Sequence, residues 1–246
     1  MKVFVFDNYD EASEQAADLV EAQILENNQS VLGLATGSTP LGLYKRLIEG
    51  VTSRGISYKN VRTINLDEYI GLDKDHPESY HTFMAENLFN HIDISIDNTY
   101  IPDGTADSPE GECLRYEEIV DSVGPIDLQI LGIGTNGHIG FNEPGTDLDS
   151  LTHVVELVAS TRESNARFFP SIDEVPTHAI TTGIKSILKS KKIILLASGK
   201  NKAEAVKTLL SKNVSESFPA SYLWNHKDVT LLVDRDAYQL VQLKGQ

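Results

Sequence analysis

The chain has 246 residues, of which 40% are hydrophobic and 23% charged, a composition typical of a globular protein and unlike that of a disordered one. Its 36 Asp and Glu residues against 21 Lys and Arg residues give a formal charge of −15, which repels nucleic acid and anionic lipid at long range. We therefore expect neither partner, and any anion site must be built locally from backbone N–H groups and a few basic side chains.

Short apolar strands alternate with amphipathic helices along the whole chain. The first strand is predicted at residues 3–6 and the first helix at 10–27, with Asp10 as its N-cap. The later strands are predicted at 31–35, 61–66, 126–131, 193–197 and 229–233. The later helices are predicted at 41–54, 79–89, 110–123 and 201–210. This alternation predicts an α/β fold, and because no linker divides residues 1–246 we expect a single three-layer α/β/α domain with a mainly parallel sheet.

The sequence gives no sign of a targeting segment, a disulfide or a metal site. The apolar run at the N-terminus stops at Asp7, and no later apolar run approaches the ~20 residues of a membrane helix, so a cytoplasmic protein is expected. Cys113 is the only cysteine and is interpreted as structural. The histidines and acids of residues 73–81 match no metal motif, and Pro77 interrupts any helical face between them.

In open α/β sheets, ligands bind beyond the carboxyl ends of the strands. Thr36, Gly37, Ser38 and Thr39 follow the second predicted strand and precede a helix that Pro40 could open at its first turn. Small residues let the backbone approach an anion, and the helix N-terminus supplies positive potential, so this loop is a candidate phosphate site. The alternative is an ordinary capped turn, which is the commoner fate of a lone loop of this composition.

Two adjacent acids, Asp67 and Glu68, follow the third predicted strand. A carboxylate at this position, partly desolvated by bound ligand, is suited to take a proton from a carbon next to a carbonyl group. The alternative is an N-cap or a solvated acidic pair, which is favoured when no other feature supports a site.

Residues 131–144 are the most informative segment of the chain. Four glycines within nine residues surround His138, and Asn136 and Glu143 are near enough in sequence to hydrogen-bond a ring nitrogen. A histidine held by a carboxylate is the usual arrangement for moving protons near neutral pH. A lone buried histidine is more often a core residue, but the glycines and polar neighbours favour catalysis. The glycine spacing does not match a dinucleotide-binding motif.

Lys202 follows another predicted strand and lies in the first turn of a predicted helix. A cation there opposes the helix dipole, which indicates anion binding, whereas the alternative is a solvated surface lysine.

These junctions together closely resemble the glucosamine-6-phosphate deaminase family over nearly the whole chain. The resemblance is carried by the segments LATGSTP, NLDEYIGL, HPESYHTFM, LGIGTNGHIGFNEPG, STRESNARFF and SGKNKAEAV, which occur in the family's order and spacing. It implies a modified Rossmann-like fold, no metal or organic cofactor, and conversion of glucosamine 6-phosphate and water to fructose 6-phosphate and ammonium.

The resemblance also implies residue roles. Asp67 would move a proton from C2 to C1 of the sugar, and His138, assisted by Glu143, would open the pyranose ring. Arg167 and Lys202 would hold the phosphate with the backbone of residues 37–39, and residues 152–176, which carry Arg167, would form a mobile lid.

One departure is Asn136, where well-studied family members have an aspartate beside the catalytic histidine, although some shorter bacterial relatives also have asparagine. An asparagine can orient the imidazole but cannot stabilise its cation by charge, so Glu143 would carry more of that role and the pH profile would differ. The basic residues of the family's allosteric hexamers are replaced here at His153 and Val155. We therefore expect a monomer or small homo-oligomer without allosteric activation.

Two rival functions share this architecture. A 6-phosphogluconolactonase would hydrolyse a lactone, and the acid of LDEY followed by NGHIGFNEP argues against it. A sugar-phosphate sensor is disfavoured because no basic helix-turn-helix segment precedes the first strand and the net charge opposes DNA contact.

Overall fold

The computed structural model describes residues 1–159, 162–163, 166 and 169–241. Its centre is a seven-stranded sheet in the order β1-β10-β9-β6-β2-β3-β5, in which every neighbouring pair is parallel. The strands are β1 (Lys2–Phe6), β2 (Val31–Leu34), β3 (Arg62–Asn65), β5 (Thr99–Tyr100), β6 (Leu128–Gly132), β9 (Lys192–Ala197) and β10 (Val229–Asp234). The predicted α/β class with a mainly parallel sheet is confirmed.

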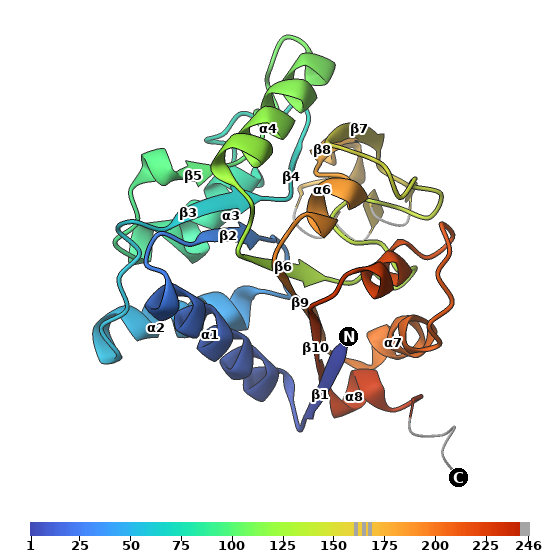
Figure 1. Ribbon diagram of the computed structural model, residues 1–246. Coiled ribbons are helices and arrows are strands. Elements are labelled where there is room, and N and C mark those ends of the chain that lie inside the picture. Colours follow the sequence, from blue (N-terminus) through green and yellow to red (C-terminus); the bar gives the residue numbers. More distant parts are fainter. Residues whose placement is uncertain (160–161, 164–165, 167–168, 242–246) are drawn as a thin grey trace.

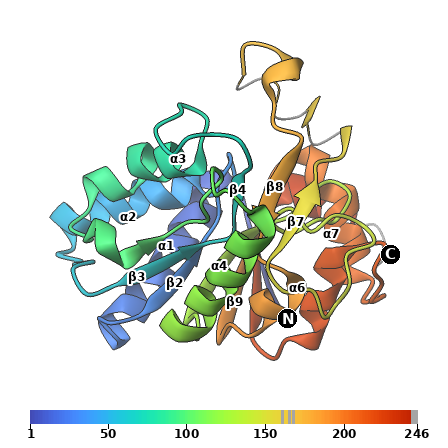
Figure 2. The same ribbon diagram turned by 90° about the horizontal axis from the view of Figure 1, so that it is seen from above.

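Helices cover both faces of this sheet (Figures 1 and 2). The first face carries α1 (Tyr9–Glu26), α2 (Leu41–Ser53) and α3 (Tyr80–Asn87), and the second carries α4 (Pro109–Val123), α6 (Ile184–Leu188), α7 (Ala203–Leu210) and α8 (Arg235–Tyr238). Strand β9 shows why both faces are apolar. Ile194 and Leu196 pack with α1 and α2, while Ile193 and Leu195 pack with α6 and α7. A strand buried on both sides is a continuous apolar run because successive side chains point to opposite faces.

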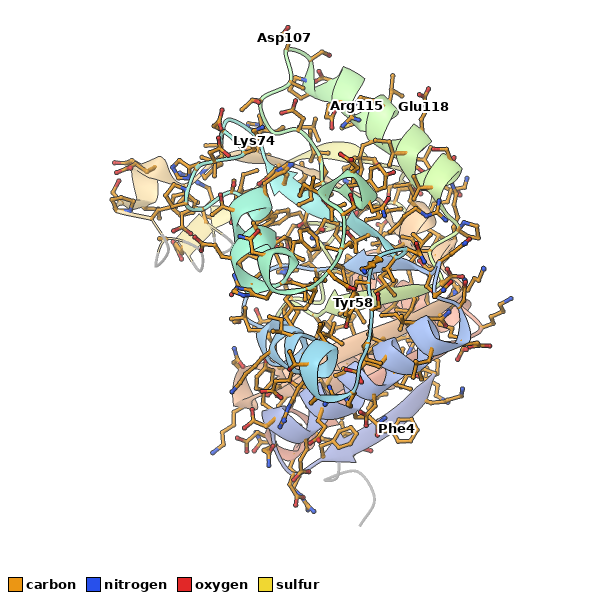
Figure 3. The ribbon with its side chains drawn as sticks, turned by 90° about the vertical axis from the view of Figure 1, so that its left-hand side faces the viewer. Phe4, Tyr58, Lys74, Asp107, Arg115 and Glu118 are labelled. Atoms are coloured by element: carbon orange, nitrogen blue, oxygen red, sulfur yellow. The ribbon has the colours of Figure 1, made fainter. Side chains whose placement is uncertain are left out.

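Helix α4 shows the same division between inward and outward residues. Tyr116 and Val120 pack inward on β2 and β3. Arg115 and Glu118 project from the outer side of the helix (Figure 3). The amphipathic pattern therefore fixes how the helix lies on the sheet.

Several helix starts differ from the prediction. Helix α1 is capped by Asn8, whose side chain accepts a hydrogen bond from the N–H of Glu11, and not by Asp10, which lies in the first turn. Pro40 occupies the N-cap of α2 and not its first turn. The helix predicted at 201–210 begins as a 3-10 turn, η5 (Lys200–Lys202), before α7. The other 3-10 segments are η1 (Phe89–His91), η2 (Ile96–Asn98), η4 (Ile172–Glu174) and η6 (Pro219–Asn225).

A second, antiparallel sheet was not predicted. It contains β4 (Asp67–Tyr69), β8 (His178–Thr181) and β7 (His153–Glu156), in the order β4-β8-β7. Figure 2 shows β7 and β8 beside the main sheet, next to β4. The pairing places Asp67 opposite Thr181, so the acid that follows β3 is held by a strand from more than 100 residues later.

The centre of the main sheet is where the chain changes direction. Strands β6 and β2 are neighbours at this centre. From β2 the chain passes through α2, on the first face, to β3. From β6 it passes through β7, β8 and then α6, on the second face, to β9, which lies on the opposite side of β6 from β2. Loops diverging at such a switch point leave a crevice at the carboxyl ends of the strands, which is the common ligand site of open α/β sheets. No helix in the described part of the chain is long and apolar enough to cross a membrane.

Candidate active site

A cavity of about 460 Å³ lies at this switch point, between the loops that follow β2, β3, β6 and β9. Eight of the ten residues predicted for the site line it, namely Thr36, Gly37, Ser38, Thr39, Asp67, Asn136, His138 and Lys202. Glu143 lies behind the cavity wall, in contact with Asn136. Arg167 lies outside the described residues, as does part of the predicted lid at 152–176. The structure thus brings together residues that are up to 166 positions apart.

The loop after β2 presents unused donors to the cavity. Among the described residues, none accepts a hydrogen bond from the N–H groups of Gly37, Ser38 and Thr39. The hydroxyl of Tyr9 holds the loop from α1, since it accepts from the N–H of Gly42 at 2.7 Å and lies 2.9 Å from the carbonyl oxygen of Thr39. Unpaired N–H groups just before the N-terminus of α2 make a site for a phosphate.

Lys202 lines the same cavity from the 3-10 turn after β9. Within the described ranges, no acid forms an ion pair with its ammonium group, although the protein carries an excess of acids. Burial lowers the pKa of Lys202, because a partly desolvated ammonium without a counter-charge is disfavoured. The turn is held by Asp234, whose carboxylate accepts hydrogen bonds from the N–H of Gly199 and the hydroxyl of Ser198. A fixed, unpaired cation beside free N–H groups is suited to a dianionic ligand.

Asp67 reaches the cavity from the start of β4 and is 6% exposed. Burial, followed by the negative charge of Glu68, raises the pKa of Asp67 to about 8. No residue in the described part of the chain donates a hydrogen bond to its carboxylate. A desolvated carboxyl group with a raised pKa is a stronger base than an ordinary aspartate, as proton abstraction from carbon requires.

His138 is held by a chain of two hydrogen bonds. Its Nδ1 lies 2.8 Å from Oδ1 of Asn136, and Nδ2 of Asn136 donates to Oε2 of Glu143 at 2.6 Å. Glu143 Oε2 is 3.5 Å from His138 Nδ1, so the direct contact is the longer one. Because an amide oxygen only accepts, Nδ1 carries the proton and Nε2 has a free lone pair. Asn136 therefore transmits the orientation of the Glu143 carboxylate to the ring.

Gly134 makes room for this histidine. A Cβ atom at that position would stand 2.3 Å from the imidazole ring of His138, closer than side-chain carbons approach. The glycine-rich character of the loop thus has a steric cause at the site itself.

Of the described residues that line the cavity, ten were not predicted for the site, among them Tyr80, Phe141 and Asn201. The rings of Tyr80 and Phe141 stack with centroids 6.1 Å apart and planes at 9°. Tyr80 begins α3 in a segment interpreted from the sequence as a polar loop followed by a helix, and the backbone N–H groups of Tyr80 and His81 join that end of the helix to Glu68 in β4. No three His, Cys, Asp or Glu side chains of the described residues come together as metal ligands.

Comparison with known proteins gives a consistent result. The family model for glucosamine-6-phosphate isomerases/6-phosphogluconolactonase matches residues 7–232. The glucosamine-6-phosphate deaminase of Geobacillus sp. (strain WCH70) is 56% identical over 98% of this chain and 96% of its own length. Glucosamine-6-phosphate deaminase 1 of Bacillus subtilis (strain 168) is 55% identical over 98% of this chain and 99% of its own length.

Solved structures agree with this relation. A structure described as a monomeric glucosamine-6-phosphate deaminase superposes with a TM-score of 0.96 at 55% identity, over 98% of this chain and all of that one. The 6-phosphogluconolactonase of Trypanosoma brucei superposes with a TM-score of 0.77 at 19% identity, over 97% of each chain, which is a likeness of fold alone.

Proposed function

Because the chain belongs to the family of glucosamine-6-phosphate isomerases and 6-phosphogluconolactonases, we propose from the chemistry of its cavity that it is a deaminase of that family. The enzyme converts glucosamine 6-phosphate and water to fructose 6-phosphate and ammonium, a step of amino-sugar catabolism. One observation supports the residue roles proposed below. The desolvated carboxyl group of Asp67, the oriented imidazole of His138 and the ammonium group of Lys202 line the same cavity.

Ring opening is assigned to His138. Its free Nε2 takes the proton of the anomeric hydroxyl, and the resulting imidazolium gives a proton to the ring oxygen as the C1–O5 bond breaks. The products are a neutral imidazole and an open-chain aldehyde. Glu143, acting through Asn136, supports the transient positive charge on the ring.

Isomerisation is assigned to Asp67. The aldehyde acidifies the hydrogen on C2, and the carboxylate of Asp67 removes it. The electron pair forms the C1–C2 double bond while the aldehyde oxygen takes a proton from the ammonium group on C2, which gives a neutral enolamine. Asp67 then returns its proton to C1, which leaves an iminium cation at C2. Addition of water to C2 and loss of ammonium give the ketose phosphate, so atoms and charges balance with one water consumed.

The phosphate is assigned to Lys202 and to the N–H groups of residues 37–39, with Arg167 as a further partner. A tethered phosphate lets binding energy fix the reacting end of the sugar against Asp67 and His138. We place residues 1–246 in one working domain with residues 152–176 as its lid. The hydrophobic cluster in which Phe169 and Val175 of that segment pack with Tyr69 and Phe141 supports this placement.

The proposed oligomeric state is a monomer or small homo-oligomer. The proposed location is the cytoplasm, because a phosphorylated sugar does not diffuse across membranes. The similarity to the structure described as monomeric supports the monomer.

The reaction is tested by incubating purified protein with glucosamine 6-phosphate without added metal. We expect ammonium and fructose 6-phosphate in equal amounts, measured by coupled assays for each product. Binding without turnover would instead identify a sensor, and turnover of 6-phosphogluconolactone alone would identify the lactonase. The preparation control is Asp107→Asn, which changes an exposed acid just before the start of α4 (Figure 3) and should match the wild type.

Replacing Lys202 with glutamine should raise KM for glucosamine 6-phosphate by about 100-fold, because a charge-assisted contact to the phosphate is worth about 1.5–3 kcal/mol. The loss should be much smaller for glucosamine, which has no phosphate. Steady-state kinetics with both sugars measures this difference. Lys200→Gln, which changes an exposed lysine of the same turn, is the matched control. Equal losses with both sugars would contradict the phosphate assignment.

A further inference from the structure

Glu68 follows the proposed base in β4 and has no role in the mechanism above. Successive side chains of a strand point to opposite faces, so Glu68 lies behind the wall that Asp67 presents to the cavity. It is 1% exposed, which is unusual for a carboxylate. Its burial therefore requires partners.

Four donors surround this carboxylate. The backbone N–H groups of Tyr69, Tyr80 and His81 donate to it at 2.8, 2.9 and 3.1 Å, and Nδ1 of His81 lies 2.9 Å away. Two of the backbone groups belong to the first turn of α3, so a negative side chain from β4 occupies the positive end of this helix. A set of hydrogen bonds to one carboxylate thus connects β4 with the start of α3, beside the contact between the rings of Tyr69 and Tyr80.

This connection determines where Tyr80 lies. Tyr80 is the first residue of α3, it lines the cavity, and its ring stacks on Phe141. Asp67 of β4 and Tyr80 of α3 both line the cavity, so a shift of the first turn of α3 would move the Tyr80 ring relative to Asp67.

We propose that Glu68 is a positioning residue for the reaction, whose carboxylate ties the first turn of α3 to the strand that carries Asp67 and places a fixed negative charge directly behind that base. The inference rests on the proposed function, because it assigns Glu68 a part in the proton transfer by Asp67.

The other groups near this pair leave Glu68 as the nearest negative charge. The titratable and charged groups around Asp67 and Glu68 are Tyr44, Tyr69, Tyr80, Tyr116, Glu78, His81, Asp103, His138 and Lys202. Burial raises the pKa of each of the four tyrosines, so they stay neutral near pH 8. The charge of Glu78 acts on the buried Tyr69, and His81 and Asp103 act on each other, whereas Glu68 acts on Asp67 itself.

The charge has a chemical use. Asp67 must take a proton from C2 and then return it to C1, and a group does both best when its pKa lies near the working pH. Burial and the Glu68 charge raise the pKa of Asp67 to about 8, which meets that requirement. A neutral residue in place of Glu68 would leave a weaker base.

Two substitutions separate the charge from the reach of the side chain. In Glu68→Gln the negative charge is lost. The acid limb of the pH profile of kcat/KM should therefore move to lower pH by about one unit, and the plateau value of kcat/KM should fall about threefold to tenfold. In Glu68→Asp the charge stays but the shorter side chain no longer reaches α3, so the limb should stay in place while KM rises. Ser79→Ala, which removes the uncharged cap of the same helix, is the matched control and should leave the limb in place.

A measurement on the wild type covers the case in which Glu68→Gln does not fold. The carboxyl resonance of Asp67 in protein labelled with carbon-13 aspartate, assigned by its loss in Asp67→Asn, should titrate well above the ordinary range near pH 4. Titration of Asp67 in the ordinary range would overturn the proposal. So would a Glu68→Gln variant whose acid limb and Asp67 titration match those of the wild type. An acid limb that shifts as much in Ser79→Ala as in Glu68→Gln would also overturn it. Since the titration needs no substrate, it stands even if the protein releases no ammonium, which would refute only the function.

Discussion

Asp67→Asn should abolish turnover and at the same time make the folded protein more stable. Without a carboxylate at this position no group in the described cavity is placed to take the hydrogen from C2, so kcat should fall by at least about 1,000-fold. Substrate binding should be nearly unchanged, because the phosphate contacts lie at residues 37–39 and Lys202. Exchange of the C2 hydrogen with deuterated solvent, followed by NMR, measures the chemical step, and retained exchange would refute the role of Asp67.

The gain in stability follows from the direction of the pKa shift. The pKa of Asp67 is about 8 in the folded protein and about 4 in an unfolded chain, so the folded state binds the proton more tightly. The favourable contribution of protonated Asp67 is complete below pH 4 and is lost as pH rises to about 8. The stability of the wild type therefore falls below that of the Asn variant over this window, by an amount on the order of 5 kcal/mol at pH 8, or about 10–20 °C in Tm.

Thermal unfolding at pH 4 and pH 8 tests this prediction. The difference in Tm between Asp67→Asn and wild type should be small at pH 4 and large at pH 8. Asp107→Asn makes the same chemical change at an exposed position and should show no such dependence. A stability gain of the same size at both pH values would mean that burial of a charge is not its cause. The wild-type kcat/KM should also fall as pH drops below about 8, since only ionised Asp67 takes the proton.

His138→Gln should lower kcat by about 100-fold to 10,000-fold with glucosamine 6-phosphate, because glutamine can hydrogen-bond to Asn136 but cannot move a proton. The loss should be less than about tenfold with the 4,5-dideoxy analogue, which stays open because it lacks the hydroxyls that close the pyranose and furanose rings. Comparing kcat for the two sugars isolates ring opening from the later steps.

The control is His91→Gln, which changes an exposed histidine whose Nε2 contacts a backbone carbonyl far from the cavity, and its rates should equal those of the wild type. Equal losses with ring and open-chain sugars in His138→Gln would remove the ring-opening assignment.

The strand ends predicted from the sequence account for most of the site. The residues after β2, β6 and β9 could be found because each follows an apolar run and a parallel sheet brings all such positions to one edge. Asp67 was found for the same reason, since it follows β3.

The antiparallel sheet could not be predicted in this way. Strands β4, β7 and β8 have three or four residues each, too short for an alternating pattern, and the partner of Asp67 is Thr181. Tyr80 in the cavity wall was missed as well, because the hydrogen bonds that join the first turn of α3 to Glu68 leave no pattern in the sequence.

The order of the groups at His138 was also beyond the sequence. Asn136 and Glu143 were both predicted near the ring, but spacing does not reveal that Asn136 lies between the other two. Likewise, the contact of Tyr9 with the loop at residues 38–42 joins residues about 30 positions apart and leaves no local signal.

The pairing of β1 with β10 affects how the protein is made on the ribosome. Lys2 pairs with Thr230, 228 positions later, and among the described residues β1 has no other partner strand in the sheet. At about 5–20 residues per second, the nascent chain carries an unpaired apolar strand for about 10–45 seconds before β10 is synthesised. Phe4 and Val5 are still exposed in the finished protein, so this strand presents apolar side chains and unpaired backbone groups to other chains during translation.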